Sequence, residues 1–239
     1  MARITRRLAD LASGRLLDQA LVIGKTPLSD RFVRVELRSE RFRSASWTPG
    51  AKIQMRPERG TLAMRTYTPT VWDTAEGTTA LIAFTHGDGP ASAWFERAAT
   101  GDVCELFGPR RSLDLSGTAA KVVFVGDESS VGLAGALHTT KTEGVTHILE
   151  ADAPAELTTV LTALGITQNV TVVSKTPGRE ELLSAARDAA GADEAPYDLV
   201  VTGDAATVHL TRRAAREWHP RPARVLGKAY WAEGRTGLD

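Results

Sequence analysis

The spacing of apolar residues changes near residue 115, and this change predicts two kinds of structure in succession. Before it, short β-like runs alternate with turns that contain Gly and Pro: QALVIGKTPL, FVRVELR, AKIQMRP, LAMRTYTP, TALIAFTHG and DVCELFGP. Such runs predict an antiparallel barrel or sandwich. After it, the Val-rich runs KVVFVGD, THILEAD, NVTVVSK, YDLVVTGD and RVLGKAYW alternate with segments of helical composition such as PAELTTVLTALG. Strand alternating with helix predicts parallel strands with right-handed crossovers, a doubly wound domain.

A short segment of small and polar residues separates the two patterns. LSGTAA has the composition of a linker, and we place the boundary inside it. A chain of 239 residues is long enough for two domains of ordinary size. The sequence therefore predicts a β domain over residues 1–117 and an α/β domain over residues 118–239.

The composition argues against several classes of protein. With 42% apolar and 24% charged residues, the chain has the balance of a soluble globular protein. No apolar run reaches the roughly 18 residues that span a bilayer, and MARITRRLADLASGRLL is too charged for a signal peptide. We therefore expect a cytoplasmic protein without membrane insertion. The single cysteine, Cys104, excludes an internal disulfide and a four-cysteine cluster, so redox chemistry would need a bound cofactor.

The remaining polar residues favour neither a metal nor a nucleic acid as ligand. Residues 1–65 contain 14 Lys/Arg and 6 Asp/Glu, a net charge of +8, and the other 15 and 23 give −8. The basic part has no compact cluster with interleaved aromatic residues, so a small anionic ligand explains it as well as a nucleic acid does. No metal-ligand spacing links the five histidines, which are His86, His138, His147, His209 and His219.

The stretch RTYTP is unusual for a core strand. Side chains alternate between the two faces of a strand, so Arg65 and Tyr67 share one face while Thr66 and Thr68 share the other. A charge and a ring on one face, followed by a proline that ends the pairing, indicate an elongated ligand that crosses the strand. An exposed cross-strand ladder is the alternative.

A second stretch, HGDGPASAW, lies one predicted strand later and has the pattern of a phosphate-binding loop. Gly87 and Gly89 free the backbone for close approach, and Pro90 suits the first position of a helix. The amides of Ala91 and Ser92 would then point out of the open end of that helix, where a pyrophosphate binds well. A plain Gly-rich turn that caps a helix is the alternative.

Together, RTYTP, HGDGPASAW, a strand that closes on VGDE and the tail AYWAEGR resemble the ferredoxin-reductase-like flavoproteins. Within that group they resemble the siderophore-interacting proteins, which are ferric-siderophore reductases. The motifs follow the order of the family from Arg65 to Arg235. The resemblance implies an antiparallel β-barrel domain that binds FAD, followed by a doubly wound parallel-sheet domain that binds NADH or NADPH.

The resemblance also implies contacts with FAD in the first domain. Tyr67 would lie against the flavin ring, Thr68 would hydrogen-bond near the reactive N5, and Arg65 would pair with the phosphates. A phenol stacks on a flat ring, and a guanidinium binds phosphate oxygens bidentately. We therefore expect Tyr67 and Thr68 to take part in catalysis. The rest of the expected FAD site is the loop of His86, Gly87, Gly89, Pro90, Ala91 and Ser92.

The first turn of the second domain, GDESSVGLAG, lacks the G-x-G-x-x-G fingerprint of dinucleotide-binding folds. A strand that ends at Gly126, with Ser129 and Ser130 before a helix, is still where a nicotinamide dinucleotide would place its phosphates. Asp127 and Glu128 match the Gly-Asp-Glu of the family and are expected close to the nicotinamide. Acidic residues that stabilise a helix N-terminus are the alternative.

Residues that end the next two predicted strands leave the nicotinamide nucleotide undecided. Glu150 and Asp152 would favour a free ribose hydroxyl and repel a 2′-phosphate, which indicates NADH. Ser174 and Lys175 resemble a Ser-Arg pair that holds the 2′-phosphate in NADPH-using relatives. Ordinary polar residues at strand ends would look the same.

The expected substrate contacts are more dispersed. Similarity to the family places Trp231 and its neighbours Lys228 and Arg235 near the open flavin face and the substrate, although a half-buried edge strand would contain the same aromatic residues. Lys52 is a candidate contact for an anionic ferric chelate, with a solvated lysine as the alternative. Thr70 stands where family members often have an arginine, and the sequence stops shortly after the AYWAEGR motif, where some relatives continue into a helix.

The sequence therefore predicts an FAD-dependent reductase that passes electrons from NADH or NADPH to a ferric siderophore. Iron(II) is held far more weakly than iron(III) by hard oxygen ligands, so reduction would release the metal. Two alternatives remain open: a general flavin or ferredoxin-type reductase with another acceptor, and a flavin- or siderophore-binding module without turnover. The siderophore, the oligomeric state and the tightness of FAD binding are left open.

Overall fold

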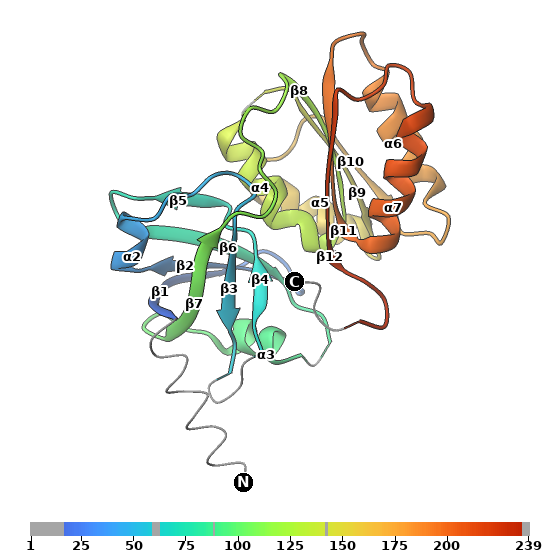
Figure 1. Cartoon of the computed structure of the whole chain (residues 1–239). Helices are drawn as coiled ribbons and strands as arrows, with labels where there is room; N and C mark the ends of the chain where they lie inside the picture. The colour runs from blue at the N-terminus through green and yellow to red at the C-terminus, as the bar shows by residue number, and fades with distance from the viewer. Residues whose placement is uncertain (1–16, 59–62, 88, 142, 236–239) are drawn as a thin grey trace. The chain divides into compact units, whose positions relative to one another are not determined.

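The computed structural model of the chain describes residues 17–58, 63–87, 89–141 and 143–235 (Figure 1). The basic amino-terminal stretch and Asp88 of the HGDGPASAW loop lie outside the described residues. Contacts divide the chain into two compact units, of which the first ends at Asp114 and the second begins at Leu115. Each unit has its own sheet and its own core.

The first unit contains a seven-stranded antiparallel sheet in the order β4-β3-β7-β1-β2-β6-β5. Because β4 at one edge also contacts β6 beside the other edge, the sheet curls into a barrel. This confirms the predicted antiparallel β domain, to which the structure adds the short strand β5. The strands are β1 (Asp18–Pro27), β2 (Phe32–Arg38), β3 (Lys52–Arg56), β4 (Arg65–Tyr67), β5 (Val71–Asp73), β6 (Thr78–Phe84) and β7 (Val103–Arg110).

Alternation along β2 shows why this unit folds as a barrel. Val33, Val35 and Leu37 are buried in the core, while Arg34 and Glu36 between them face outward and form an ion pair of 2.9 Å. A period of two residues places every second side chain in the interior. Among the described residues of this unit, the helices α2 (Glu40–Arg43) and α3 (Pro90–Arg97) accompany the sheet, and α3 contributes two aromatic side chains to the core.

The second unit contains a five-stranded parallel sheet in the order β10-β9-β8-β11-β12, and this confirms the predicted doubly wound domain. Its strands are β8 (Lys121–Gly126), β9 (Val145–Ala151), β10 (Val170–Ser174), β11 (Tyr197–Asp204) and β12 (Arg224–Trp231). Its helices are η1 (Glu128–Ser130), α4 (Val131–Thr140), α5 (Pro154–Ala163), α6 (Glu180–Ala190), α7 (Ala205–Ala214) and η2 (Ala215–Glu217). None of the helices among the described residues is long and apolar enough to cross a membrane.

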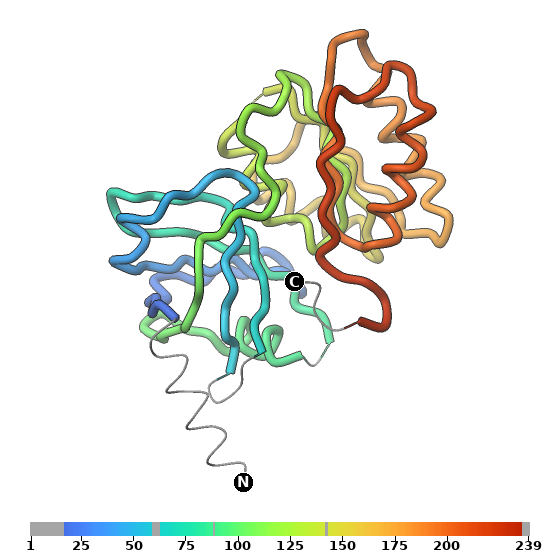
Figure 2. Tube along the Cα trace, in the orientation of Figure 1, coloured from blue at the N-terminus to red at the C-terminus, as the bar shows by residue number. Residues whose placement is uncertain are grey.

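The helices of the second unit cover both faces of its sheet, α4 and α5 on one face and α6 and α7 on the other (Figures 1 and 2). The interior strand β11, between β8 and β12, is buried along its whole length, as expected for a Val-rich strand between two helical layers. From β8 the chain winds outward to β9 and β10, then returns to β11 and β12 on the other side of β8. The strand order therefore reverses between β8 and β11, and ligands of such sheets bind outside the carboxyl ends of the strands at this point.

Candidate functional site

The structure brings the RTYTP and HGDGPASAW stretches together in the first unit. The ring of Tyr67, on β4, lies 4.9 Å from the ring of Phe95, on α3, in an edge-on arrangement at 66°. The same Tyr67 packs against the core of the barrel. Strand β4 and helix α3 therefore lie side by side, although β5 and β6 separate them in the sequence (Figure 1).

Strand β4 presents partly exposed side chains at the edge of the sheet. Burial raises the pKa of the Tyr67 phenol above its usual value, so this group stays protonated at neutral pH and can donate a hydrogen bond. The Nη1 of Arg65 donates to the carbonyl of Met64 at 2.9 Å. Thr70 is buried, and both its amide and its hydroxyl donate to the carbonyl of Ala80, at 2.9 and 3.2 Å. The position of the arginine common in the family thus holds a small side chain that ties the turn to β6 and adds no charge.

The loop before α3 fits a phosphate-bearing cofactor. Gly89 precedes the helix with φ −70° and ψ 149°, a conformation open to any residue, and an added Cβ would meet no atom within 4 Å. Neither the backbone nor the packing requires glycine here, and the space that a Cβ would fill is available to a ligand. Ala91 and Ser92 belong to the first turn of α3, whose amides have no partner within the helix and point toward its open end.

The remaining residues of this loop support its shape. Gly87 has a φ of +64°, in the left-handed region that favours glycine. The hydroxyl of Ser92 donates to the carbonyl of His86 at 3.1 Å, which closes the loop on itself. The ring of His86 stacks on Phe84 at the end of β6, with 4.9 Å between ring centroids. The loop is therefore fastened at its start by the sheet and at its end by the helix.

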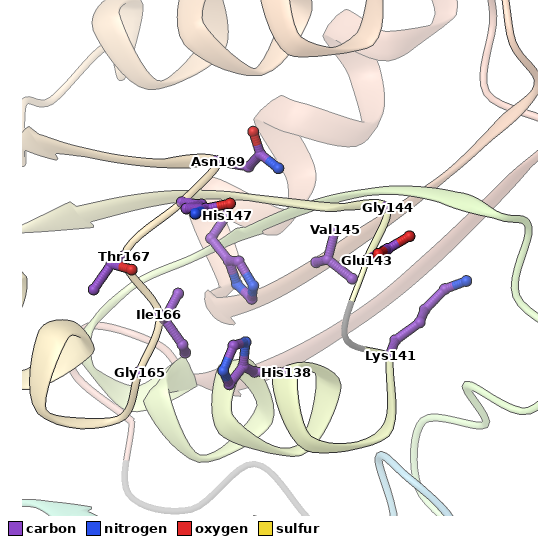
Figure 3. Close-up of a pocket in the computed structure, with 11 residues that line it drawn as sticks. His138, Lys141, Glu143, Gly144, Val145, His147, Gly165, Ile166, Thr167 and Asn169 are labelled. Carbon is purple, nitrogen blue, oxygen red and sulfur yellow. The ribbon is translucent and has the colours of Figure 1, made fainter.

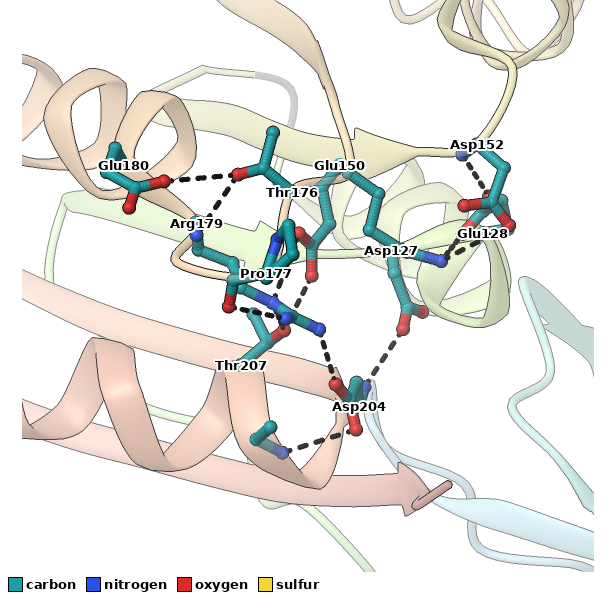
Figure 4. A network of polar contacts seen from close by, with 12 residues as sticks. Asp127, Glu128, Glu150, Asp152, Thr176, Pro177, Arg179, Glu180, Asp204 and Thr207 are labelled. Carbon is teal, nitrogen blue, oxygen red and sulfur yellow. Dashed lines mark hydrogen bonds and ion pairs between the residues drawn. The ribbon is translucent and has the colours of Figure 1, made fainter. Parts of the chain in front are cut away.

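In the second unit, Asp127 is the centre of a buried polar network at the carboxyl edge, the edge where the parallel strands end (Figure 4). Its Oδ1 accepts from the amide and hydroxyl of Ser129, and its Oδ2 accepts from the amide of Asp204 at 2.9 Å and from the indole of Trp231 at 2.7 Å. Burial raises the pKa of Asp127, and the hydrogen bonds from Ser129 and Trp231 oppose that rise. One carboxylate thus joins the ends of β8, β11 and β12. Gly126 before it is required by packing, because an added Cβ would lie 2.6 Å from the Cβ of Ser130.

Glu128 and Lys175 form the second part of the network. The Lys175 ammonium lies 2.9 Å from Oε2 of Glu128 and 3.8 Å from the carboxylate of Asp152, and 5.5 Å from the ring centroid of Trp231. The other oxygen of Glu128 accepts from the amide of Asp152 at 2.8 Å. Burial would lower the pKa of Lys175, but the hydrogen bond and the charge of Glu128 outweigh burial and raise it. Lys175 is therefore a cation held by carboxylates of its own chain.

Arg179 holds a third part, which sequence reasoning missed. Its Nε donates to the hydroxyl of Thr207 at 3.0 Å, and its Nη2 donates to Asp204 at 2.7 Å (Figure 4). Thr207 in turn donates to Glu150 Oε1 at 2.5 Å, and Glu150 Oε2 lies 3.5 Å from Arg179 Nε. The backbone of Arg179 is left-handed, with φ 55°. Its partners come from β9, β11 and α7, so only the folded topology brings them together.

The structure modifies one expectation about this edge. Glu150 was expected to meet a ribose hydroxyl, but its side chain is completely buried and bound by Thr207, and burial raises its pKa. Asp152 is the exposed acidic side chain at the end of β9. Ser174 is exposed at the end of β10. Among the predicted site residues of this unit, the network thus joins Asp127, Glu128, Lys175 and Trp231.

The other expected substrate residues lie apart from the described contacts of this network. Lys228 is half-buried within β12, and Arg235 is exposed after a turn that its amide closes on the carbonyl of Ala232 at 3.1 Å. In the first unit, Lys52 is half-buried at the start of β3, opposite Arg110 in the sheet. Their roles in substrate binding stay predictions.

A pocket of about 320 Å³ lies at the opposite, amino-terminal edge of the parallel sheet (Figure 3). His138 at the end of α4 and His147 on β9 point toward each other across it. His147 is only 2% exposed, and burial, assisted by the charge of His138, lowers its pKa to about 4. Its Nδ1 has no hydrogen-bond partner. Because the pocket lies where β9 and β10 begin, it is separate from the network around Asp127, which lies where the parallel strands end.

Comparisons with known proteins agree with this arrangement. Residues 15–113 match the family model of the siderophore-interacting FAD-binding domain. In fold, the chain is similar to the siderophore-interacting protein SipS from Aeromonas hydrophila, with a TM-score of 0.73 and 20% identity over 92% of this chain and 93% of that one. It is also similar to a siderophore utilization protein from T. fusca, with a TM-score of 0.70 and 20% identity over 93% and 95% of the two chains.

A more distant similarity joins the chain to phthalate dioxygenase reductase, with a TM-score of 0.69 and 15% identity over 92% of this chain and 70% of that one. A comparison with curated protein sequences gives no match. The chain therefore has the two-domain fold of the ferredoxin-reductase-like flavoproteins, and its resemblance to the siderophore-interacting proteins, predicted from RTYTP and HGDGPASAW, is confirmed.

Proposed function

We propose that the protein is an FAD-dependent oxidoreductase that uses NADH or NADPH to reduce a ferric siderophore. The observation that carries the proposal is the match of residues 15–113 to the siderophore-interacting FAD-binding domain. That domain is followed in the chain by a doubly wound unit, the kind of fold that binds dinucleotides. Bound FAD would accept a hydride from the nicotinamide and deliver electrons singly to the iron.

The first unit would hold FAD through β4 and the start of α3. Arg65 supplies a guanidinium for the phosphates, and the amides of Ala91 and Ser92 supply donors at the positive end of a helix. The protonated phenol of Tyr67 offers a flat face and a hydrogen-bond donor, and Thr68 follows it at the end of the strand. Because Tyr67 rests on Phe95 and the barrel core, its ring is positioned before any ligand arrives.

The second unit would bind the nicotinamide nucleotide at the carboxyl edge, where the strand order reverses. Asp127 fixes the indole of Trp231 there through a hydrogen bond of 2.7 Å. Lys175 lies over the same ring, so the indole is held from two directions. Trp231 is still 36% exposed, which leaves part of its ring available to a bound ligand. In this reaction the chain would bind FAD, the nucleotide and the ferric chelate and orient them toward one another. No side chain needs to transfer a proton.

The substrate in this proposal is an anionic ferric chelate with hard oxygen ligands. Lys52 in the first unit is a candidate contact for it, and in the second unit Lys228 and Arg235 offer positive charge and Trp231 an apolar surface. Reduction releases the metal because the same oxygens hold iron(II) far more weakly. The excess of basic residues before Arg65 supports an anionic ligand for the first unit.

A visible spectrum of the purified protein with added FAD tests the proposal. A bound flavin that NADH or NADPH bleaches anaerobically, and that a ferric chelate reoxidises with release of iron(II), would support it. A bound flavin that neither nucleotide bleaches would indicate a binding module instead. A reduced flavin that a protein acceptor or a quinone reoxidises much faster than any ferric chelate would indicate a general reductase.

A further inference from the structure

We infer that the nucleotide is NADH rather than NADPH, because the carboxyl edge of the second sheet offers no unpaired positive charge to a 2′-phosphate among the residues that form its network. The inference rests on the proposed function, since it names the electron donor of that reaction. It also resolves the conflict between the acidic and the basic strand ends in the sequence.

The position of the 2′-phosphate follows from the sheet order. In doubly wound sheets the dinucleotide crosses the carboxyl edge. On the side of β8 where β9 and β10 lie, the strand ends carry Asp152 and the Ser174–Lys175 pair, and the Asp152 carboxylate lies 3.8 Å from the Lys175 ammonium. A carboxylate at this place accepts a hydrogen bond from a ribose hydroxyl and repels a phosphate, which carries nearly two negative charges near pH 7.

Lys175 is the nearby residue that could reverse this preference, and it is already paired. Its ammonium lies 2.9 Å from Glu128 and 3.8 Å from Asp152, and its side chain is only 17% exposed. A 2′-phosphate that approached Lys175 would meet the carboxylates of Glu128 and Asp152 beside it, and their repulsion would offset the attraction of the ammonium. The Ser-Lys pair at the end of β10 therefore differs from a phosphate site with a free cation.

Arg179 is paired even more completely. All three nitrogens of its guanidinium donate within the chain: Nε to Thr207 at 3.0 Å, Nη1 to the carbonyl of Pro177 at 2.9 Å, and Nη2 to Asp204 at 2.7 Å. Its side chain is only 13% exposed. Release of Arg179 toward a phosphate would leave Glu150 and Asp204 buried without their cation, which is strongly unfavourable.

The net charge of the network also disfavours a 2′-phosphate. It contains the two cations Lys175 and Arg179, so with all five carboxylates ionised its net charge is −3. Burial raises the pKa of two of these carboxyls, and with both of them protonated the balance is still −1. The five are Asp127, Glu128, Glu150, Asp152 and Asp204.

Backbone donors at this edge are also filled by carboxylates of the chain. Asp127 accepts from the amide of Ser129 at the start of η1, and Asp204 accepts from the amide of Ala206 at the start of α7. Helix N-termini otherwise attract phosphate groups. One amide at each of these two helix starts is therefore bound by a carboxylate of the protein and is not available to an additional 2′-phosphate.

Calorimetric titration of the FAD-loaded protein with NAD⁺ and NADP⁺ tests the inference without turnover. We expect NAD⁺ to bind at least tenfold more tightly, and kcat/KM for flavin reduction to favour NADH by a similar factor. Because the discrimination is electrostatic, the ratio should fall as salt is raised from about 0.05 M to about 0.5 M. A ratio that salt leaves unchanged would contradict the electrostatic cause.

The variant Asp152→Arg should shift the ratio toward NADP⁺ by at least fivefold, because it removes the exposed carboxylate and adds a cation. The side chain of Asp152 is 65% exposed, and the hydrogen bond to Glu128 uses its backbone amide, so the fold tolerates the change. Asp188→Arg makes the same change of charge at an exposed position of α6 and serves as the control. It should leave the ratio of NAD⁺ to NADP⁺ affinity as in the wild type.

The outcomes separate this inference from the proposed function. Equal or tighter binding of NADP⁺ by the wild type, with flavin reduction intact, refutes the preference for NADH and leaves the reductase standing. An Asp152→Arg shift no larger than that of Asp188→Arg also refutes it. If neither nucleotide binds or bleaches the flavin, the proposed function fails and the inference fails with it.

Discussion

Acidification should destabilise the protein through one buried side chain, His147. Burial, together with the charge of His138, lowers the pKa of His147 from 6.5 to about 4 in the folded chain. In the unfolded chain the His147 imidazole binds a proton near pH 6.5, whereas in the folded chain it binds one only near pH 4. The contribution of His147 to stability is therefore fully present above pH 6.5 and is lost as the pH falls through 4.

The size of the effect follows from this difference in pKa. One pKa unit corresponds to about 1.4 kcal/mol, so the whole shift is worth about 3 kcal/mol. Between about pH 7.5 and about pH 5, integration over the two protonation equilibria gives a loss of about 2 kcal/mol in the free energy of unfolding. Because His147 is only 2% exposed, solvent screening reduces this loss little.

Urea unfolding followed by circular dichroism at the two pH values measures the loss. The wild type should lose about 2 kcal/mol more than His147→Gln, whose amide does not titrate. The control His209→Gln changes an exposed histidine on α7 and should behave as the wild type. If His147→Gln loses as much stability on acidification as the wild type, the burial of a neutral imidazole is not the cause.

Three further variants test other contacts. Gly89→Val should weaken FAD binding at least tenfold in a fluorescence titration, because the valine side chain enters the free space in front of α3. It should cost at most about 1 kcal/mol in the free energy of unfolding. Unchanged FAD affinity would show that this space is not the cofactor site. Arg179→Met should cost about 3–5 kcal/mol because it leaves buried carboxylates without their cation, whereas Arg187→Met, at an exposed position of α6, should stay within about 0.5 kcal/mol. Equal melting temperatures for these two variants would contradict the network. Glu105→Gln should cost about 1–3 kcal/mol in urea unfolding, because Arg56, 2% exposed, loses a charged partner; a change below about 0.5 kcal/mol would speak against this pair.

The architecture could be predicted from the sequence because its signal is periodic. Alternation in FVRVELR predicts a strand with one buried face, and the structure places β2 over those residues. Continuous apolar runs such as YDLVVTGD predict strands covered on both sides, and β11 is buried throughout. The three-residue strand β5 was missed because VWD is too short to show a period.

The side-chain network at the carboxyl edge could be predicted only in part. The motif around Asp127 and Glu128 pointed to a functional turn, but their partners Trp231 and Lys175 come from strands far along the chain. Arg179 stands in an ordinary helix-starting context, and nothing in its local sequence marks it. Which carboxylate neutralises which cation depends on where the crossovers place the strand ends, and local patterns carry no information about that.

The hydrogen bonds of Asp127 join residues that are far apart in the sequence, and this affects the folding of the second unit. Its carboxylate is bonded to residues 77 and 104 positions later in the sequence. Contacts between such distant segments must follow the closure of long loops. The hydrogen bonds of Asp127 therefore form only after β8, β11 and β12 have come together, and opening of any one of these strands breaks at least one of them. In hydrogen exchange, the amide of Asp204 would record each such opening, so its exchange rate measures how often the hydrogen bond between the ends of β8 and β11 breaks.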